Sequence, residues 1–370
     1  MNCPHFKSCG NCRYPLEDYE ASLQQKTERI RKVLDPFTIG EVTPAVTPLH
    51  YRHKAIFHFA QKEGKLIAGF HPEGSGKVFP LKDCPLQAGS ACKVLEDLLP
   101  ILRRHKLTAY DPLSKRGCLR HLLIRVSREG KLLLCFVTGS REFYSSKEII
   151  KEIRILHPEI IGVDHCVNPR NTSVVIEGKV RPLYGKGFLR DELGGNTYHI
   201  ASSSFYQVDP RMAEKIYGRA LERLGLSGKE KVADAYCGNG TISLLAAKQA
   251  KEVTGIEINP ASVAGAKESA LRNDVQNVRF VCADAPEYLM KHSFEALIVD
   301  PPRAGLTKEL CTSLLKNGPQ RIAYISCDPS TLARDLKVLQ KAYKVGKVDL
   351  FDQFAYTDHL EAVVLLSRRS

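Results

Sequence analysis

The chain has 370 residues, of which 43% are hydrophobic and 26% are charged. This length predicts two or three domains, and the composition is typical of packed globular proteins rather than disordered ones. The N-terminal residues lack the apolar core of a secretory signal, and no stretch approaches the roughly 20 apolar residues that cross a bilayer. We therefore expect a soluble, cytoplasmic protein, whose 12 cysteines are core residues, catalytic thiols or metal ligands rather than disulfides.

Positive charge is concentrated in the first part of the chain. The net charge is +13, and residues 1–200 carry 31 Lys and Arg against 21 Asp and Glu, whereas residues 201–370 carry 23 against 20. A polyanion bound through its phosphates would explain this asymmetry, and a solvated basic face is the alternative explanation. The basic residues of the most cationic stretch include Arg103, Arg104, Lys106, Lys115, Arg116, Arg120, Arg125 and Arg128.

Residues 1–200 are predicted to form an α+β domain. A helix is expected over 16–34 and another over 145–156, with short strands between turn signals such as REGK and NPRN. The predicted strands are KAIFHFA, KLIAGFH, CLRHLLIRVS, KLLLCFVTG and TSVVIEG.

Residues 201–370 alternate between apolar strands and helices. The predicted strands are EKVADAY, KEVTGIEI, NVRFVCAD, FEALIVDPP and RIAYISCDP, and the helices cover 242–250, 261–273, 308–317 and 331–341. This alternation predicts an α/β domain with a doubly wound parallel sheet. Such sheets bind ligands where the strands end.

The loops after the first three of these strands contain a glycine turn and acidic residues. Gly238 and Gly240 let the backbone approach a ligand at a helix N-terminus, but they lack the third glycine of a dinucleotide fingerprint. Glu257 lies seventeen residues after Gly240, where a carboxylate can accept ribose hydroxyls, and Asp284 follows the third strand. Together they favour a nucleoside-containing cofactor, although each acid alone is more often a solvated loop residue.

The later strands end in residues suited to covalent catalysis. Asp300 begins DPPR, and Cys327 ends the fifth strand just before a helix, whose N-terminus is expected to lower the thiol pKa. Glu361 leads into the last strand, where burial would raise its pKa toward that of a base, with Asp358 and His359 beside it. Two alternatives remain: amino-methyltransferases use a tetrapeptide similar to DPPR, and a strand-end cysteine can be a small core residue.

Four cysteines near the start of the chain form a candidate metal site. Cys3, Cys9 and Cys12 have the spacing C-x5-C-x2-C, and Cys84 supplies a fourth thiol. Four thiolates suit an iron–sulfur cluster or zinc, and the spacing alone leaves both open. Cys92 is an alternative fourth ligand. The remaining cysteines are expected to be small apolar residues.

The segments DAYCGNG, GIEIN, DPPRAG, SCDPSTLARDL and DHLEAVVLL resemble the RNA uracil-C5 methyltransferase family, whose 23S rRNA and tRNA members share these motifs. The resemblance covers residues 200–370 and most of the N-terminal half. It implies a Rossmann-like S-adenosylmethionine-dependent methyltransferase domain over 201–370, preceded over 1–200 by an α+β RNA-binding domain with a cluster arm.

The resemblance also implies roles for single residues. Cys327 corresponds to the nucleophile that adds to uracil C6, Glu361 to the base that removes the C5 proton, and Asp300 to the acid of the DPPR motif. The segment FYQVDP resembles the family's FxQVN, with Asp209 in place of the common Asn. The expected cofactor contacts are Gln207, Tyr236, Gly238, Gly240, Glu257, Asp284 and Asp300.

The expected cofactors are S-adenosylmethionine and a [4Fe-4S] cluster on Cys3, Cys9, Cys12 and Cys84, since the family's rRNA members carry this cysteine arrangement. The chain resembles the shorter members without an N-terminal oligonucleotide-binding barrel. We expect a monomer that acts on 23S rRNA and binds neither DNA nor membrane. A tRNA uracil-C5 methyltransferase, a non-catalytic zinc-containing RNA-binding protein and a radical iron–sulfur enzyme are the alternatives.

Overall fold

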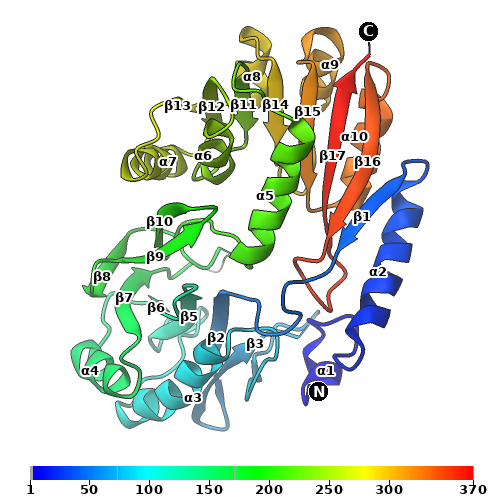
Figure 1. Ribbon diagram of the computed structural model, residues 1–370. Helices are drawn as coiled ribbons and strands as arrows, with labels where there is room; N and C mark the ends of the chain where they lie inside the picture. The colour runs from blue at the N-terminus through cyan, green and yellow to red at the C-terminus, as the bar shows by residue number, and fades with distance from the viewer. Residues whose placement is uncertain (1–2, 73, 171, 173, 370) are drawn as a thin grey trace. The chain divides into compact units, whose positions relative to one another are not determined.

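The computed structural model describes residues 3–72, 74–170, 172 and 174–369. The chain divides into two compact units (Figure 1). Unit 1 comprises residues 1–17, 47–191 and 199–204, and unit 2 comprises residues 18–46, 192–198 and 205–370. No helix in the described ranges is long and apolar enough to cross a membrane.

Unit 2 is built on an eight-stranded sheet with the order β1-β16-β17-β15-β14-β11-β12-β13. Strands β11 to β15 are parallel, whereas β17 is antiparallel to both β15 and β16. Consequently β17 begins at the edge where the parallel strands end. The strands are β1 (Ile39–Thr43), β11 (Lys231–Ala235), β12 (Glu252–Glu257), β13 (Val278–Cys282), β14 (Ala296–Val299), β15 (Arg321–Ser326), β16 (Tyr343–Phe351) and β17 (Glu361–Arg368).

Helices cover both faces of this sheet (Figure 1). One face packs against α2, α8, α9 and α10 through a continuous core that includes Ile30, Leu310 and Leu336. The other face carries α5, α6 and α7. The helices are α2 (Tyr19–Leu34), α5 (Pro210–Leu224), α6 (Thr241–Ala247), α7 (Pro260–Arg272), α8 (Ala285–Lys291), α9 (Lys308–Asn317) and α10 (Pro329–Leu339).

The sequence analysis assigned all of residues 1–200 to the first domain, but residues 18–46 lie in unit 2. Strand β1 pairs in parallel with β16, with Val42 opposite Leu350. Helix α2 buries Ile30 and Leu34 in the core of unit 2. Sheet pairing and apolar burial thus attach this segment to strands that lie about 300 residues further along the chain.

Unit 1 contains a seven-stranded sheet with the order β4-β3-β2-β5-β6-β7-β8. Helices α3 and α4 cover one face, where their apolar residues join those of the strands in one core. A two-stranded hairpin, β9–β10, lies where the chain passes between the units. The elements are α1 (Phe6–Cys9), β2 (Lys54–Lys62), β3 (Lys65–Phe70), β4 (Phe79–Pro80), α3 (Gly89–Arg104), β5 (Leu119–Val126), β6 (Leu132–Thr138), α4 (Ser146–Leu156), β7 (Ile160–Val167), β8 (Val180–Tyr184), β9 (Phe188–Leu193) and β10 (Asn196–Ala201).

One predicted strand of unit 1 is wrong. The β-branched segment TSVVIEG, insofar as it lies within the described residues, forms a loop, and β8 begins only at Val180. The Asn168 side chain holds this loop by donating hydrogen bonds to the carbonyls of Val174 and Val175, at 2.9 and 3.2 Å. A side-chain amide therefore satisfies carbonyls that a strand would have paired.

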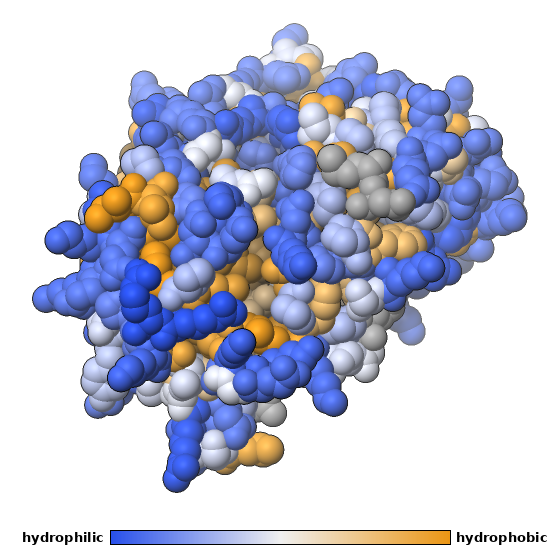
Figure 2. Space-filling model, turned by 90° about the horizontal axis from the view of Figure 1, so that it is seen from below, coloured by the Kyte–Doolittle hydropathy of each residue, from blue (hydrophilic) through white to orange (hydrophobic). Residues whose placement is uncertain are grey.

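Several side chains of the basic stretch form hydrogen bonds inside unit 1. Arg120 and Arg125 are buried and donate to backbone carbonyls, the former to Asn168 and Arg170 at 2.5 Å each. By contrast, Lys106, Lys115 and Arg116 are exposed. Hydrophilic side chains cover much of the surface in Figure 2, with apolar side chains gathered between them. Only part of the excess charge is thus available to a polyanion.

Candidate active site

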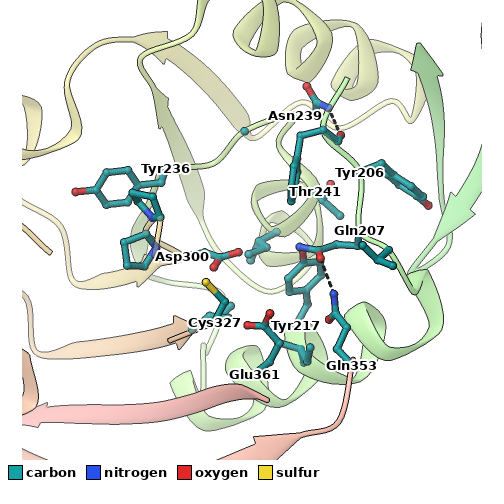
Figure 3. A pocket seen from close by; sticks show the side chains of 18 of the residues that line it. Tyr206, Gln207, Tyr217, Tyr236, Asn239, Thr241, Asp300, Cys327, Gln353 and Glu361 are labelled. Carbon is teal, nitrogen blue, oxygen red and sulfur yellow. Dashed lines mark hydrogen bonds between the residues drawn. The ribbon is translucent and has the colours of Figure 1, made fainter. Parts of the chain in front are cut away.

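A cavity of about 370 Å³ opens at the edge of the sheet of unit 2 where the parallel strands end (Figure 3). This is where doubly wound sheets bind ligands, and the volume suits a small organic ligand. Segments 205–208, 236–239, 300–303 and 353–354 contribute to its lining. Of the sequence-predicted site residues, those that line it are Gln207, Tyr236, Gly238, Asp300, Cys327, His359 and Glu361.

Strand register brings Cys327 and Glu361 together. Ser326, the last residue of β15, lies opposite Ala362 of β17, so the residues just beyond this pair, Cys327 and Glu361, lie side by side. Asp300 follows directly on the neighbouring strand β14. Figure 3 shows the thiol and the two carboxylates pointing into the same space. A nucleophile and two acids thus meet although up to 61 residues separate them in the chain.

Both carboxylates titrate far above their usual range. Burial, followed by the charge of Asp300, raises the pKa of Glu361 to about 8, and Arg303 partly offsets the rise. Burial raises the pKa of Asp300 to about 7. Two carboxyls at one buried site disfavour double ionisation, so protons remain at the site near neutral pH. As expected from the sequence, Glu361 has a base-like pKa.

The expected lowering of the Cys327 pKa is wrong. Burial, followed by the charges of Glu361 and Asp300, raises the thiol pKa to about 11. The following helix, α10, offers little compensation, because its N-cap Asp328 already accepts the amide protons of Ser330 and Thr331 at 2.9 and 3.1 Å. The helix end that was expected to stabilise a thiolate is thus occupied by a carboxylate.

A hydrogen-bonded chain of side chains forms another wall of the cavity. Gln353 Nε2 donates to Gln207 Oε1 at 2.8 Å, and Gln207 Nε2 donates to the hydroxyl of Tyr217, also at 2.8 Å (Figure 3). Tyr217 is buried on α5. Asp209 caps this helix by accepting the amide of Arg211 at 3.1 Å, a role that Asp and Asn fill equally well. The sequence motifs did not indicate Tyr217 or Gln353 as residues of this site. Gln353 could have been suspected, because it follows closely on the end of a strand.

The glycine turn connects β11 to α6. Tyr236 and Gly238 both have positive φ angles, at 63° and 53°, and both line the cavity. Glu257 accepts hydrogen bonds from the backbone amides of Gly238 and Asn259, at 3.1 and 2.8 Å, and these bonds stabilise the turn. A carboxylate with two such bonds still has lone pairs for further donors.

Three predicted cofactor residues, Glu257, Gly240 and Asp284, do not line the cavity. Gly240 is needed for packing, because a Cβ there would lie 2.6 Å from the Phe280 ring. Asp284 is exposed and caps α8 by accepting the amide of Glu287 at 3.1 Å. A buried acid that the sequence did not single out, Asp234, accepts a 2.6 Å hydrogen bond from Ser243. Burial raises the pKa of Asp234 to about 7.

Comparison with known proteins shows the family to which this chain belongs. A family described as tRNA (Uracil-5-)-methyltransferase matches residues 192–369. Uncharacterized RNA methyltransferases of Bacillus cereus and Halalkalibacterium halodurans are each 36% identical to it, over 99% and 100% of this chain and 82% and 83% of their own. The chain belongs to the RNA uracil-C5 methyltransferase family. It is therefore an RNA-modifying enzyme that uses S-adenosylmethionine.

A solved member of this family has a similar fold along almost the whole chain. The tRNA (uracil-54, C5)-methyltransferase of Pyrococcus abyssi, in complex with S-adenosylhomocysteine, is 26% identical, with a TM-score of 0.81. The match covers 94% of this chain and 83% of that protein. The family's Rossmann-like methyltransferase fold is thus present in unit 2.

The cavity of this methyltransferase is suited to a cationic cofactor. Asp234 Oδ1 is buried and has no hydrogen-bond partner among the described residues, and burial raises the pKa of both Asp300 and Glu361. S-adenosylmethionine carries a sulfonium and an ammonium group. Positive charge at this place would favour the ionised form of each acid.

The four N-terminal cysteines lie in unit 1, and all four are free and partly exposed. His5 packs against Phe79 with ring centroids 4.8 Å apart, and its Nε2 accepts the amide of Lys82 at 3.4 Å, so the N-terminal loop lies against the segment that carries Cys84. Burial, followed by the charge of Cys84, raises the pKa of Cys12 to about 12. Across the described ranges, no group of three or more His, Cys, Asp or Glu has a geometry that could hold a metal.

Proposed function

We propose that this enzyme methylates C5 of a uridine in 23S rRNA through a covalent bond between Cys327 Sγ and uracil C6. The observation that carries the proposal is the meeting of Cys327, Asp300 and Glu361 where β15, β14 and β17 adjoin. Uracil C5 is a weak nucleophile, and addition of a thiolate to C6 gives C5 enolate character. The three groups are those that such a reaction needs.

S-adenosylmethionine supplies the electrophilic methyl group. The Cys327 thiolate would form the S–C6 bond, and C5 would then take the methyl group as the bond between that methyl and the cofactor sulfur breaks, which leaves S-adenosylhomocysteine. Glu361 accepts the proton that C5 loses, and the returning electron pair breaks the S–C6 bond and regenerates the Cys327 thiolate. One proton leaves the site in each turnover, which Glu361 passes to solvent.

The other lining residues would hold the two substrates. Asp300 would bind the polar edge of the uracil and favour its enolate. Gln207, Tyr236, Gly238 and Glu257 would hold the cofactor, with Asp284 and Gly240 supporting the loops beside it. The target base must leave its stack to reach the cavity, since C6 is inaccessible within a helix.

The protonation states set a requirement for the order of events. With a thiol pKa of about 11 and a Glu361 pKa of about 8, the site holds protons that catalysis must remove. A cationic cofactor bound in the cavity would lower both pKa values by Coulomb attraction. We therefore infer that the cofactor binds before Cys327 becomes a nucleophile.

The choice of 23S rRNA is supported by the cysteines of unit 1. Cys3, Cys9, Cys12 and Cys84 offer four thiols for a [4Fe-4S] cluster, which the family's rRNA members carry. Within this proposal, the cluster would fix the N-terminal loop of unit 1. Transfer RNA is the second candidate, because the similar Pyrococcus abyssi enzyme is a tRNA (uracil-54, C5)-methyltransferase.

Mapping 5-methyluridine in cells with and without the gene tests the substrate. We expect one or more 23S rRNA sites to lose the methyl group in the deletion strain while tRNA is unchanged. Loss confined to tRNA would instead favour the second candidate. Unchanged 5-methyluridine in both RNAs, together with no methyl transfer by the purified enzyme to either one, would contradict the proposed activity.

A further inference from the structure

A lysine outside the cavity holds the loop that carries much of its lining. Lys26 of α2 has no exposed surface, and its ammonium group binds Asp352 Oδ1 at 2.6 Å in an equally buried ion pair. The same nitrogen donates to the carbonyls of Phe354 and His359, both at 3.0 Å. All three donors of the ammonium group are therefore directed at one loop, residues 352–360, between β16 and β17.

This loop connects directly to the reactive groups. Gln353, Phe354 and His359 line the cavity, and Glu361 follows two residues after the last carbonyl that Lys26 binds. Gln353 also bonds to Gln207. Lys26 thus binds the loop at its beginning and at its end, which fixes the path of the chain into the first residue of β17.

Other contacts from the same N-terminal segment support this arrangement. The Tyr19 hydroxyl donates to Asp352 Oδ2 at 2.9 Å and accepts the amide of Ala45 at 2.6 Å. Arg29 donates to the carbonyl of Asp358 and lies 3.6 Å from its carboxylate. Asp358, which is close to Glu361 in the sequence, directs its charge at Arg29.

Burying an ion pair costs free energy on folding, because both charged groups lose their hydration. Burial lowers the pKa of Lys26, and Asp352 only partly offsets this effect. An apolar pair would fill the same space without that cost. Stability alone therefore does not explain a lysine whose three donors all bind one loop.

We propose that Lys26 is a positioning residue for catalysis, which holds the 352–360 loop so that Glu361 can reach the C5 proton. This inference rests on the proposed function. Glu361, the residue that Lys26 positions, removes the C5 proton after the covalent bond to uracil has formed. Loss of Lys26 should therefore slow proton removal and product release more than formation of the covalent bond.

The test is single-turnover kinetics with uridine-containing RNA tritiated at C5. Lys26→Met should slow tritium release by roughly 10- to 100-fold, the scale expected from a displacement of about 1 Å, and the methylated RNA–protein adduct should accumulate. The dissociation constant for S-adenosylhomocysteine should stay within a few-fold of the wild-type value. If the wild-type enzyme itself neither forms an adduct nor releases tritium, the proposed function fails rather than this inference.

Two further variants separate positioning from stability. Ile30→Ala, on the same helix, changes a buried core side chain that has no polar atom to bind the loop, so it should lower the melting temperature and leave tritium release unchanged. Lys26→Met with Asp352→Leu removes both buried charges, so it should regain stability but not rate, because the carbonyls of Phe354 and His359 stay unbound. Should Lys26→Met alone fail to fold, this double variant carries the test.

The inference is overturned if folded Lys26→Met, or the double variant, releases tritium at the wild-type rate. It is also overturned if rate follows stability alone, so that Ile30→Ala slows release as much as Lys26→Met does at equal loss of stability. A milder variant, Tyr19→Phe, removes one hydrogen bond from Asp352 and should slow release by a few-fold.

Discussion

Two groups of cysteines illustrate how differently the two units of this methyltransferase build a site. In unit 2, sheet register places Cys327 opposite Glu361 and beside Asp300, with helices covering both faces of the sheet. In unit 1, Cys3, Cys9 and Cys12 lie on a short loop and helix near the N-terminus, and contacts of His5 hold this loop against the segment that carries Cys84. Backbone pairing in the sheet fixes the first site. The second, proposed site depends on the contacts between the N-terminal loop and the segment that carries Cys84.

The largest effect should follow from changing Cys327. Cys327→Ala removes the only nucleophile of the proposed mechanism, so methyl transfer should fall by about 10⁴-fold or more. Binding of S-adenosylhomocysteine, measured by calorimetry, should change little because the cofactor contacts remain. Cys311→Ala, a buried thiol on α9, is the matched control and should retain activity. Turnover by Cys327→Ala would remove the distinction between the two groups of cysteines.

Removal of the base should stop the reaction at a later stage. Glu361→Gln keeps the size of the side chain but cannot take the C5 proton, so turnover should fall by roughly 10²- to 10³-fold. The RNA–protein adduct should accumulate as a slowly migrating band under denaturing conditions. If no band appears and the RNA is still methylated, the base lies elsewhere.

The same substitution should stabilise the protein in a pH-dependent way. The folded state holds the Glu361 proton up to a pKa of about 8, whereas the unfolded chain releases it above about 4.5. The free energy of unfolding of the wild type should therefore fall between these pH values, and Glu361→Gln should not share that fall. The variant should gain about 4 kcal/mol relative to the wild type between pH 4.5 and pH 8, measured by urea unfolding. A gain that is the same at pH 5 and pH 8 would contradict the buried, protonated carboxyl.

Loss of one of the four proposed cluster ligands should affect unit 1 alone. Cys84→Ser should abolish the metal content of anaerobically purified protein and lower its RNA affinity, since the N-terminal loop loses its tie. Affinity for S-adenosylhomocysteine should stay within about twofold, because the cofactor residues belong to unit 2. Cys118→Ser, at a buried site in the same unit, should keep its metal. Elemental analysis distinguishes iron from zinc, and equal metal content in both variants would contradict the ligand assignment.

The smallest effect concerns the basic stretch of unit 1. Lys115→Gln removes an exposed charge and should reduce the slope of log affinity for RNA against log salt by about one, without loss of stability. Arg120→Gln should instead lower stability, because it leaves the carbonyls of Asn168 and Arg170 unsatisfied. If both variants change the salt dependence equally, the division of these cations into exposed and internal ones is wrong.

Features that depend on strand ends could be predicted from the sequence. Apolar strands alternating with helices indicated the parallel sheet, and the residues that follow those strands, Asp300 and Cys327 among them, do line its edge. Glu361 could be added because it starts the last strand. These inferences needed only local patterns and the rule that ligands bind where parallel strands end.

Features that depend on distant contacts could not be predicted. Nothing near Lys26 indicates that it binds a loop more than 300 residues away, or that α2 packs in unit 2. The sequence near Cys327 shows a helix N-terminus, but it does not show the burial and the two nearby carboxylates that raise the thiol pKa. TSVVIEG has side chains typical of a strand, but the side-chain amide of Asn168 donates a hydrogen bond to a backbone carbonyl of this segment, which forms a loop.

The central claim is the covalent bond between Cys327 and the target uracil. Purified enzyme should be incubated with S-adenosylmethionine and a 23S rRNA fragment that contains 5-fluorouridine. This base carries fluorine in place of hydrogen at C5, so Glu361 has no proton to remove and the adduct should persist. Digestion and mass spectrometry should then find the methylated fluorouridine attached to the peptide that carries Cys327. Absence of an adduct with an RNA that the enzyme methylates, or an adduct on another cysteine, would contradict this account.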